Sequence, residues 1–264
     1  MDTQLTISIV NWNVREYLEK CLESIFKYSG GIKLEVIVID NASRDGSMDM
    51  VRKKFPQAAV IENNRNLGYG PAHNQAIKIA RGKYILFLNP DTEVMPGTLP
   101  NILKFMDIHP EAAACQCAAF RNKKDIEEFL ILTGFDKFLY FFSKTIHKKF
   151  PNTATARFCM NIVAKALMQS RNNLSTNFIS IKRTNLEGAF LLARMDALKL
   201  TNGFDPRHHH GGEGAHLTWD MYKAGWKLYY VLSVRIVHYK SKSFEQISDS
   251  DWAKLENEWQ RHHE

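Results

Sequence analysis

The chain has 264 residues, of which 45% are apolar and 24% are charged, and its formal net charge is +7. This length and composition predict one large globular α/β domain, or a core domain with an elaboration. No apolar run reaches the roughly 20 residues of a membrane-spanning helix, and the first residues lack a secretory signal pattern, so we expect a cytoplasmic protein.

The first 90 residues alternate between the patterns of strands and helices. Apolar or β-branched runs typical of buried strands occupy residues 5–10, 34–40, 60–61 and 84–88. Helical patterns occupy the segments between them, at residues 18–26, 47–55 and 71–80, with Ser47 expected to cap the second helix. This alternation predicts a mostly parallel, doubly wound sheet, which binds its ligands at the carboxyl ends of the strands.

The remaining residues predict a second, interrupted half. A helix is expected at 97–109 and a strand at 112–120, and regular patterning resumes with a strand at 186–194 and a helix ending near Gly225. Two more strands are expected at 227–231 and 234–238, and an amphipathic helix from Ser248. The predicted organisation is therefore a nucleotide-binding half at 1–120, an insertion at 121–185, a second half at 186–243 and a helical tail at 244–264.

Four cysteines show no metal-site spacing, and we expect Cys21, Cys115, Cys117 and Cys159 to be reduced core residues.

The positive charge is concentrated in one segment. Residues 121–183 contain twelve Lys and Arg against four acids, a net +8, which leaves the rest of the chain at −1. The same segment is rich in Phe, Leu and Tyr, and this combination favours peripheral contact with a membrane surface or an anionic ligand. An ordinary helical insertion with a solvated basic face explains the composition equally well.

Polar residues cluster where the predicted strands end. Asn11 and Asn13 follow the first strand, residues 40–45 the second, 62–65 the third and 89–91 the fourth. Any one cluster is explained by turn chemistry, but four that converge on one edge of a sheet favour a binding crevice.

Three side chains in these clusters suit a nucleotide diphosphate. Asp40 could accept the imide N–H of a pyrimidine, and Arg65 supplies positive charge for a pyrophosphate. Asp91 could bind Mg²⁺ or Mn²⁺, which proteins hold through one or two carboxylates together with substrate phosphate oxygens.

The same segments resemble family 2 glycosyltransferases of the GT-A fold, especially the rhamnosyltransferase-like members. The similarity is carried by SIVNWN at 8–13, VIDNASRDGS at 38–47, NRNLGYG at 64–70 and LFLNPDT at 86–92. It covers about the first 120 residues and resumes from Glu187 to about Ser243.

The resemblance implies an inverting transfer from a dTDP- or UDP-sugar to a saccharide or lipid-linked acceptor. It implies that the nucleotide-sugar contacts come from Asn11, Asn13, Asp40, Asn41, Arg65, Gly68 and Asn89. It also implies that Asp91 is the metal-binding Asp of a DXD-like motif whose first position is Asn89, and that His238 is a further metal or diphosphate contact.

The chain departs from the family pattern at GFDPRHHHGGEGAHL, residues 203–217. Glu213 remains, whereas Gly214 replaces the expected general base and His216 replaces a later Asp. Either Glu213 or His216 takes over as base, or the protein binds donor without efficient turnover; we favour Glu213. A separate transition-metal site at His208–His210, Glu213 and His216 has suitable ligand types but no recognised spacing.

The sequence therefore predicts a sugar transferase of surface polysaccharide synthesis that takes rhamnose or another sugar from its donor. The alternative is a nucleotide-sugar-binding homologue that has lost catalysis and acts as a partner or regulator. Nucleic-acid binding through the basic segment is disfavoured, because no nucleic-acid motif accompanies the charge.

Overall fold

The computed structural model describes residues 3–124, 126, 178–181, 186, 188–206 and 213–239. Most of the basic segment and the tail predicted from Ser248 lie outside these residues, as do Cys159 and His208–His210. No helix in the described part of the chain is long and apolar enough to cross a membrane.

The predicted alternation of strands and helices is confirmed in the first 90 residues. The elements are β1 (Leu5–Asn11), α1 (Arg15–Lys27), β2 (Leu34–Asp40), α2 (Ser47–Lys54), β3 (Ala59–Glu62), α3 (Tyr69–Ile79) and β4 (Tyr84–Leu88). Helix α1 forms for the reason that the sequence indicates: its buried side chains Leu18, Cys21, Leu22 and Ile25 recur at three- and four-residue spacing.

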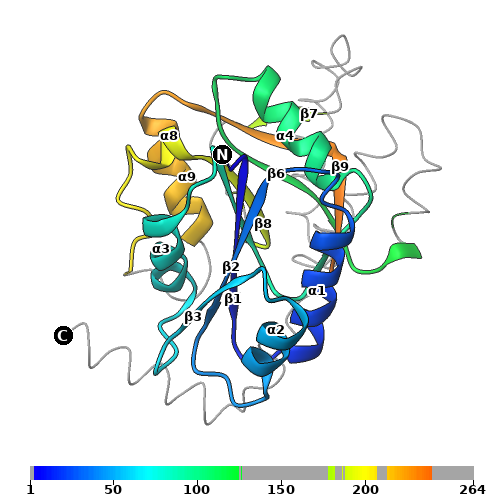
Figure 1. The fold of residues 1–264 in the computed structure, drawn as a ribbon. Coiled ribbons are helices and arrows are strands. Elements are labelled where there is room, and N and C mark those ends of the chain that lie inside the picture. The colour runs from blue at the N-terminus through cyan, green and yellow to red at the C-terminus, as the bar shows by residue number, and fades with distance from the viewer. Residues whose placement is uncertain are drawn as a thin grey trace, which may run out of the picture.

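The second half of the chain completes one sheet with the first (Figure 1). Its elements are β5 (Thr92–Val94), α4 (Thr98–Ile108), β6 (Ala112–Phe120), β7 (Phe178–Ile181), β8 (Phe190–Arg194), α8 (Met195–Leu198), α9 (Glu213–Lys223) and β9 (Lys227–His238). The strand order is β3-β2-β1-β4-β8-β6-β9-β5, and β7 pairs with β9.

The sheet is parallel in its first half and mixed in its second. Strands β3, β2, β1 and β4 are all parallel, as predicted. Strand β8 is antiparallel to both β4 and β6, and β5 and β7 are antiparallel to β9. Because β8 runs backwards, its first residue, Phe190, lies opposite Leu88, the last residue of β4.

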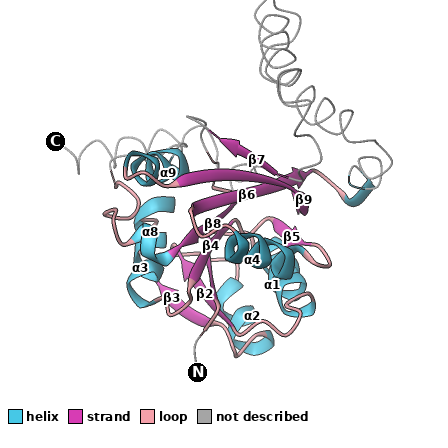
Figure 2. Cartoon of the chain, turned by 90° about the horizontal axis from the view of Figure 1, so that it is seen from above, coloured by secondary structure: helices cyan, strands magenta, loops and turns pink. Residues whose placement is uncertain are grey.

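Each face of the sheet has its own core, because alternate residues of a strand point to opposite faces. In β4, Leu86 and Leu88 pack with α1, α2 and α4, whereas Ile85 and Phe87 pack with α8 and α9. Figures 1 and 2 show the two groups of helices on the two sides, with α3 beside α8 and α9. The expectation that Cys21, Cys115 and Cys117 are free core residues is confirmed.

Four local predictions need correction. Ser47 is the first residue of α2 and Gly46 is its N-cap, so Ser47 does not cap the helix; its own N–H donates to Asp45 Oδ1 at 3.0 Å. Helix α3 begins at Tyr69, two residues earlier than expected. The strand expected at 186–194 is confined to β8, and the two strands expected at 227–238 are one strand with an irregularity in its pairing.

Candidate active site

The candidate residues lie at the end of the sheet where β1, β2 and β4 finish, which we call the carboxyl edge. Asn11 pairs in register with Asp40, and Asp40 pairs with Glu62, so these strands end side by side. Asn89–Asp91 follow β4, and His238 ends β9 opposite Thr92. The predicted convergence of the polar clusters is therefore confirmed.

The end of β2 forms a rigid polar network with the end of β1. Asn11, fully buried, donates through Nδ2 to Asp40 Oδ1 at 2.9 Å and to Ser43 Oγ at 3.0 Å. Asp40 Oδ2 accepts the Ser43 N–H at 2.8 Å, and Asn13 binds the same loop through its backbone N–H and Oδ1. Each Asp40 oxygen retains a second lone pair, so the carboxylate can still accept a donor hydrogen from a ligand.

Asn41 fixes the Gly-rich turn that precedes α3. Its Nδ2 donates to Asn66 Oδ1 at 2.9 Å and to Gly68 O at 3.2 Å, and its Oδ1 accepts from Asn63 Nδ2 at 3.0 Å. Asn41 is buried and its amide is fully engaged, so it shapes the turn through which Gly68 (φ 81°) passes. Arg65 lies exposed on the same connection between β3 and α3.

Asp91 and His238 face each other. Asp91 is buried, with Oδ1 3.3 Å from His238 Nε2, and Asn89 Nδ2 lies 3.5 Å from the same imidazole nitrogen. The backbone holds this turn at both ends, because Asn89 N–H donates to Ala189 O at 3.0 Å and Tyr239 N–H donates to Asp91 O at 2.9 Å.

This arrangement fits a hard divalent cation that is also bound by substrate. One carboxylate oxygen and one imidazole nitrogen converge, which matches the few protein ligands that Mg²⁺ or Mn²⁺ takes beside a diphosphate. Among the described residues, no group of three or more His, Cys, Asp or Glu side chains could hold a metal ion alone.

The two candidate bases are in different environments. Glu213, the first residue of α9, is buried, whereas His216, one turn later, is exposed. A Cβ added to Gly214 would lie 2.7 Å from Leu186 O, so the backbone of α9 packs directly on residue 186. The metal site considered at His208–His210 lies outside the described residues.

Tyr69 is a residue of this edge for which the sequence indicated no chemistry. Its hydroxyl donates to Gly188 O at 2.6 Å, and burial, together with the negative charge of Glu213, raises its pKa. Its ring packs edge-on against His73, whose pKa burial lowers to about 3 and whose Nδ1 lies 2.7 Å from Ser8 Oγ. The signal in the sequence is its place in the segment NRNLGYG, residues 64–70, which carries part of the family resemblance.

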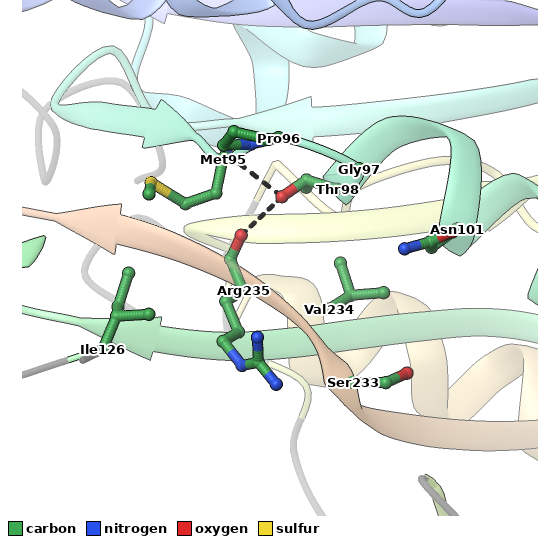
Figure 3. Close-up of a pocket in the computed structure, with 9 residues that line it drawn as sticks. All are labelled: Met95, Pro96, Gly97, Thr98, Asn101, Ile126, Ser233, Val234 and Arg235. Atoms are coloured by element: carbon green, nitrogen blue, oxygen red, sulfur yellow. Dashed lines mark hydrogen bonds between the residues drawn. The ribbon is translucent and has the colours of Figure 1, made fainter. Parts of the chain in front are cut away.

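A cavity of about 200 Å³ lies beside the start of α4 (Figure 3). It is lined by Met95, Pro96, Gly97, Thr98, Asn101, Ile126, Ser233, Val234 and Arg235. None of the candidate residues lines it, so the active-site proposal does not depend on this cavity.

Comparison with known proteins agrees with this geometry. The family model described as Glycosyl transferase family 2 matches residues 6–170. The minor teichoic acid biosynthesis protein GgaB of Bacillus subtilis is 35% identical over 102 residues, which are 37% of this chain and 11% of GgaB. The N-acetylglucosaminyl-diphospho-decaprenol L-rhamnosyltransferase of Mycobacterium tuberculosis is 25% identical over 261 residues, 92% of this chain and 78% of that protein.

A solved structure shares the fold. The mannosyltransferase PcManGT from Pyrobaculum calidifontis, in complex with GDP-Man and Mn²⁺, superposes with a TM-score of 0.60 at 19% identity. The match covers 90% of this chain and 57% of PcManGT. The predicted GT-A fold is confirmed by this likeness.

Proposed function

Since the chain belongs to glycosyl transferase family 2, we propose that it transfers a sugar, with inversion, from a dTDP- or UDP-sugar to a saccharide or lipid-linked saccharide. The observation that carries this proposal is that Asp40, Asp91 and His238 lie at one edge of the sheet. Glu213 begins the helix whose backbone packs on Leu186 and Gly188, just before β8. The rhamnosyltransferase relative and the teichoic acid relative support an acceptor in surface polysaccharide synthesis, and rhamnose is one candidate for the sugar.

The proposed donor site divides into a base end and a diphosphate end. Asp40, held by Asn11 and Ser43, accepts the imide N–H of the pyrimidine. Asn13 and the turn fixed by Asn41 and Gly68 border the nucleotide, while Arg65 pairs with the pyrophosphate. Asp91 and His238, with Asn89 beside them, would hold Mg²⁺ or Mn²⁺, which supplies charge neutralisation for the departing diphosphate.

The proposed step is a single displacement at the anomeric carbon. The acceptor oxygen forms the new C–O bond, the bond to the diphosphate breaks, and its electron pair leaves with the nucleoside diphosphate. The hydroxyl proton passes to the Glu213 carboxylate, which is a better candidate than His216 because Glu213 is buried and close enough to Tyr69 for its negative charge to raise the pKa of that phenol, whereas His216 is exposed.

A second candidate function follows from Gly214. A protein that binds donor without turnover would hold the pyrimidine and the metal with the same residues and would lack only the removal of the acceptor proton. For either function, the +8 charge of residues 121–183 supports peripheral association with an anionic membrane. We propose a cytoplasmic protein that does not bind nucleic acid.

One measurement tests donor binding in both candidates, and a second separates them. The midpoint temperature of thermal unfolding should be higher with UDP, dTDP or GDP and Mn²⁺ than for the free protein, and Asp91→Ala should reduce this increase. Release of nucleoside diphosphate from a sugar donor then distinguishes an enzyme from a binder. An unchanged unfolding midpoint with every nucleotide would exclude both candidates.

A further inference from the structure

The Tyr69 hydroxyl joins two segments that are 119 residues apart in the sequence. Tyr69 begins α3, directly after Gly68, and its Oη donates to Gly188 O at 2.6 Å. The ring is held in place by His73 and Phe204, whose centroids lie 4.3 Å and 5.7 Å away at steep interplanar angles. The hydroxyl therefore has a fixed direction.

The turn that receives this hydrogen bond also touches the proposed metal ligands. Gly188 and Ala189 precede β8, and Ala189 O accepts the Asn89 N–H at 3.0 Å. Asn89 opens the turn that carries Asp91. A displacement of the Gly188–Ala189 turn would therefore be transmitted to Asp91 through one backbone hydrogen bond.

The same turn supports the start of α9. A Cβ added to Gly214 would lie 2.7 Å from Leu186 O and 3.5 Å from Gly188 N, so the backbone that carries Glu213 packs on Leu186 and Gly188. A Cβ at Gly188 would lie 2.6 Å from Tyr69 Oη, so only glycine lets the hydroxyl approach this closely.

We propose that Tyr69 is a positioning residue for the transfer reaction. Its hydroxyl holds the Gly188–Ala189 turn and so sets the separation between the Glu213 carboxylate and the Asp91 turn. This inference rests on the proposed function, in which Glu213 takes the acceptor proton. Tyr69 itself does not touch the reacting atoms.

Loss of the hydroxyl should slow turnover more than it weakens donor binding. Glu213 and Asp91 both remain in Tyr69→Phe, but the separation between them is no longer fixed, and misplacement by about 1 Å is enough to slow a reaction roughly 10²-fold. We expect kcat to fall about 10- to 100-fold while the donor KM changes less than about 3-fold.

The matched control is Tyr229→Phe. The Tyr229 hydroxyl donates to Glu111 Oε1 at 2.7 Å at the opposite end of the sheet, so both variants lose one hydrogen bond of similar length. We expect similar unfolding midpoints for the two variants and a normal kcat for Tyr229→Phe. Equal kcat values in the two variants would overturn the proposal.

Hydrogen exchange tests the same link without turnover. The Asn89 amide, bonded to Ala189 O, should exchange about five- to tenfold faster in Tyr69→Phe than in the wild type or in Tyr229→Phe. Unchanged exchange at Asn89 would contradict the positioning role even if the wild type does not turn over. Absence of transfer by the wild type with every donor would instead count against the proposed function alone.

Discussion

Both ends of the sheet carry buried polar side chains, but among the described residues only the carboxyl edge leaves polar atoms available to a ligand. At the amino edge, where β4 begins, the Arg194 guanidinium donates to the carbonyl oxygens of Ala112, Met106 and His109 at 2.7–3.1 Å and contacts Tyr84 Oη at 3.3 Å. Two of these carbonyls belong to the last turn of α4 and to its C-cap, where helices leave acceptors unpaired. The protein itself satisfies this end.

At the carboxyl edge the polar side chains are held in place, but at least one buried polar atom has no hydrogen-bond partner in the described part of the chain. Asn11 Oδ1 is buried and has no hydrogen-bond partner among the described residues, although its Nδ2 is doubly engaged. Asp91 and His238 provide two converging ligand atoms, fewer than a divalent cation takes. A buried polar group without a partner is destabilising, so its presence at this end favours a binding role over a structural one.

The largest effect is expected at Glu213, the proposed base. Replacement by Gln keeps the shape and removes the proton acceptor, so kcat should fall by about 10²–10⁴-fold while stabilisation by UDP and Mn²⁺ persists. His216→Gln, on the exposed face of the same helix, should transfer sugar at close to the wild-type rate. The opposite result would assign proton removal to His216.

Asp91→Asn should reduce transfer by roughly 10²–10³-fold, because the carboxylate charge that binds the cation is lost. The Mn²⁺-dependent rise in unfolding temperature with UDP should also shrink. Asp107→Asn is the matched change at the amino edge, where the carboxylate pairs with Lys83 at 2.6 Å, and it should leave the rate unchanged. Equal losses in the two variants would contradict the functional difference between the edges.

Arg194→Met should lower the free energy of unfolding by about 3 kcal/mol, because two buried carbonyl oxygens and one partly buried carbonyl oxygen lose their donor. Urea denaturation measures this loss. The rate per folded molecule should stay at the wild-type value, and a large drop in that rate would show that the amino edge is not purely structural.

Gly214→Asp should not restore a faster enzyme. Its Cβ would meet Leu186 O at 2.7 Å, so the substitution should destabilise the fold by about 1–3 kcal/mol and leave kcat no higher. Ala215→Asp places the same carboxylate one residue later on a partly exposed position and should be better tolerated. A stable and faster Gly214→Asp variant would show that the chain lacks only its expected base.

The smallest effect concerns Glu111, whose pKa is lowered to about 2, chiefly by the hydrogen bond from Tyr229. Because the folded pKa lies below the ordinary glutamate pKa of 4.5, the hydrogen bond stabilises the fold above pH 4.5, and this stabilisation is lost as the pH falls towards 2. Tyr229→Phe should reduce the acid-induced loss of unfolding free energy in this window by less than about 1 kcal/mol, since Glu111 is partly exposed. An equally steep acid dependence in both proteins would exclude this pair as its source.

The sequence was sufficient to place the candidate residues at one edge of the sheet, but not to predict the whole sheet. Alternating strand and helix patterns identified β1 to β4, and parallel strands bring their carboxyl ends together, so Asp40 and Asp91 could be placed at one edge. The antiparallel insertion of β8 between β4 and β6 was not predictable, because an apolar run carries no signal for strand direction.

The amino-acid sequence alone identifies the available carboxylates, amides and imidazoles, and the segments that carry them resemble family 2 glycosyltransferases. How these groups are arranged follows only from the fold, because it depends on contacts between residues far apart in the chain. Asn41 donates hydrogen bonds to Asn66 and Gly68 in the Gly-rich turn, Gly214 packs on Leu186, and the Tyr69 hydroxyl donates to Gly188 O. The physical reason is that hydrogen-bond direction and close backbone approach are set by packing, and no local pattern records them.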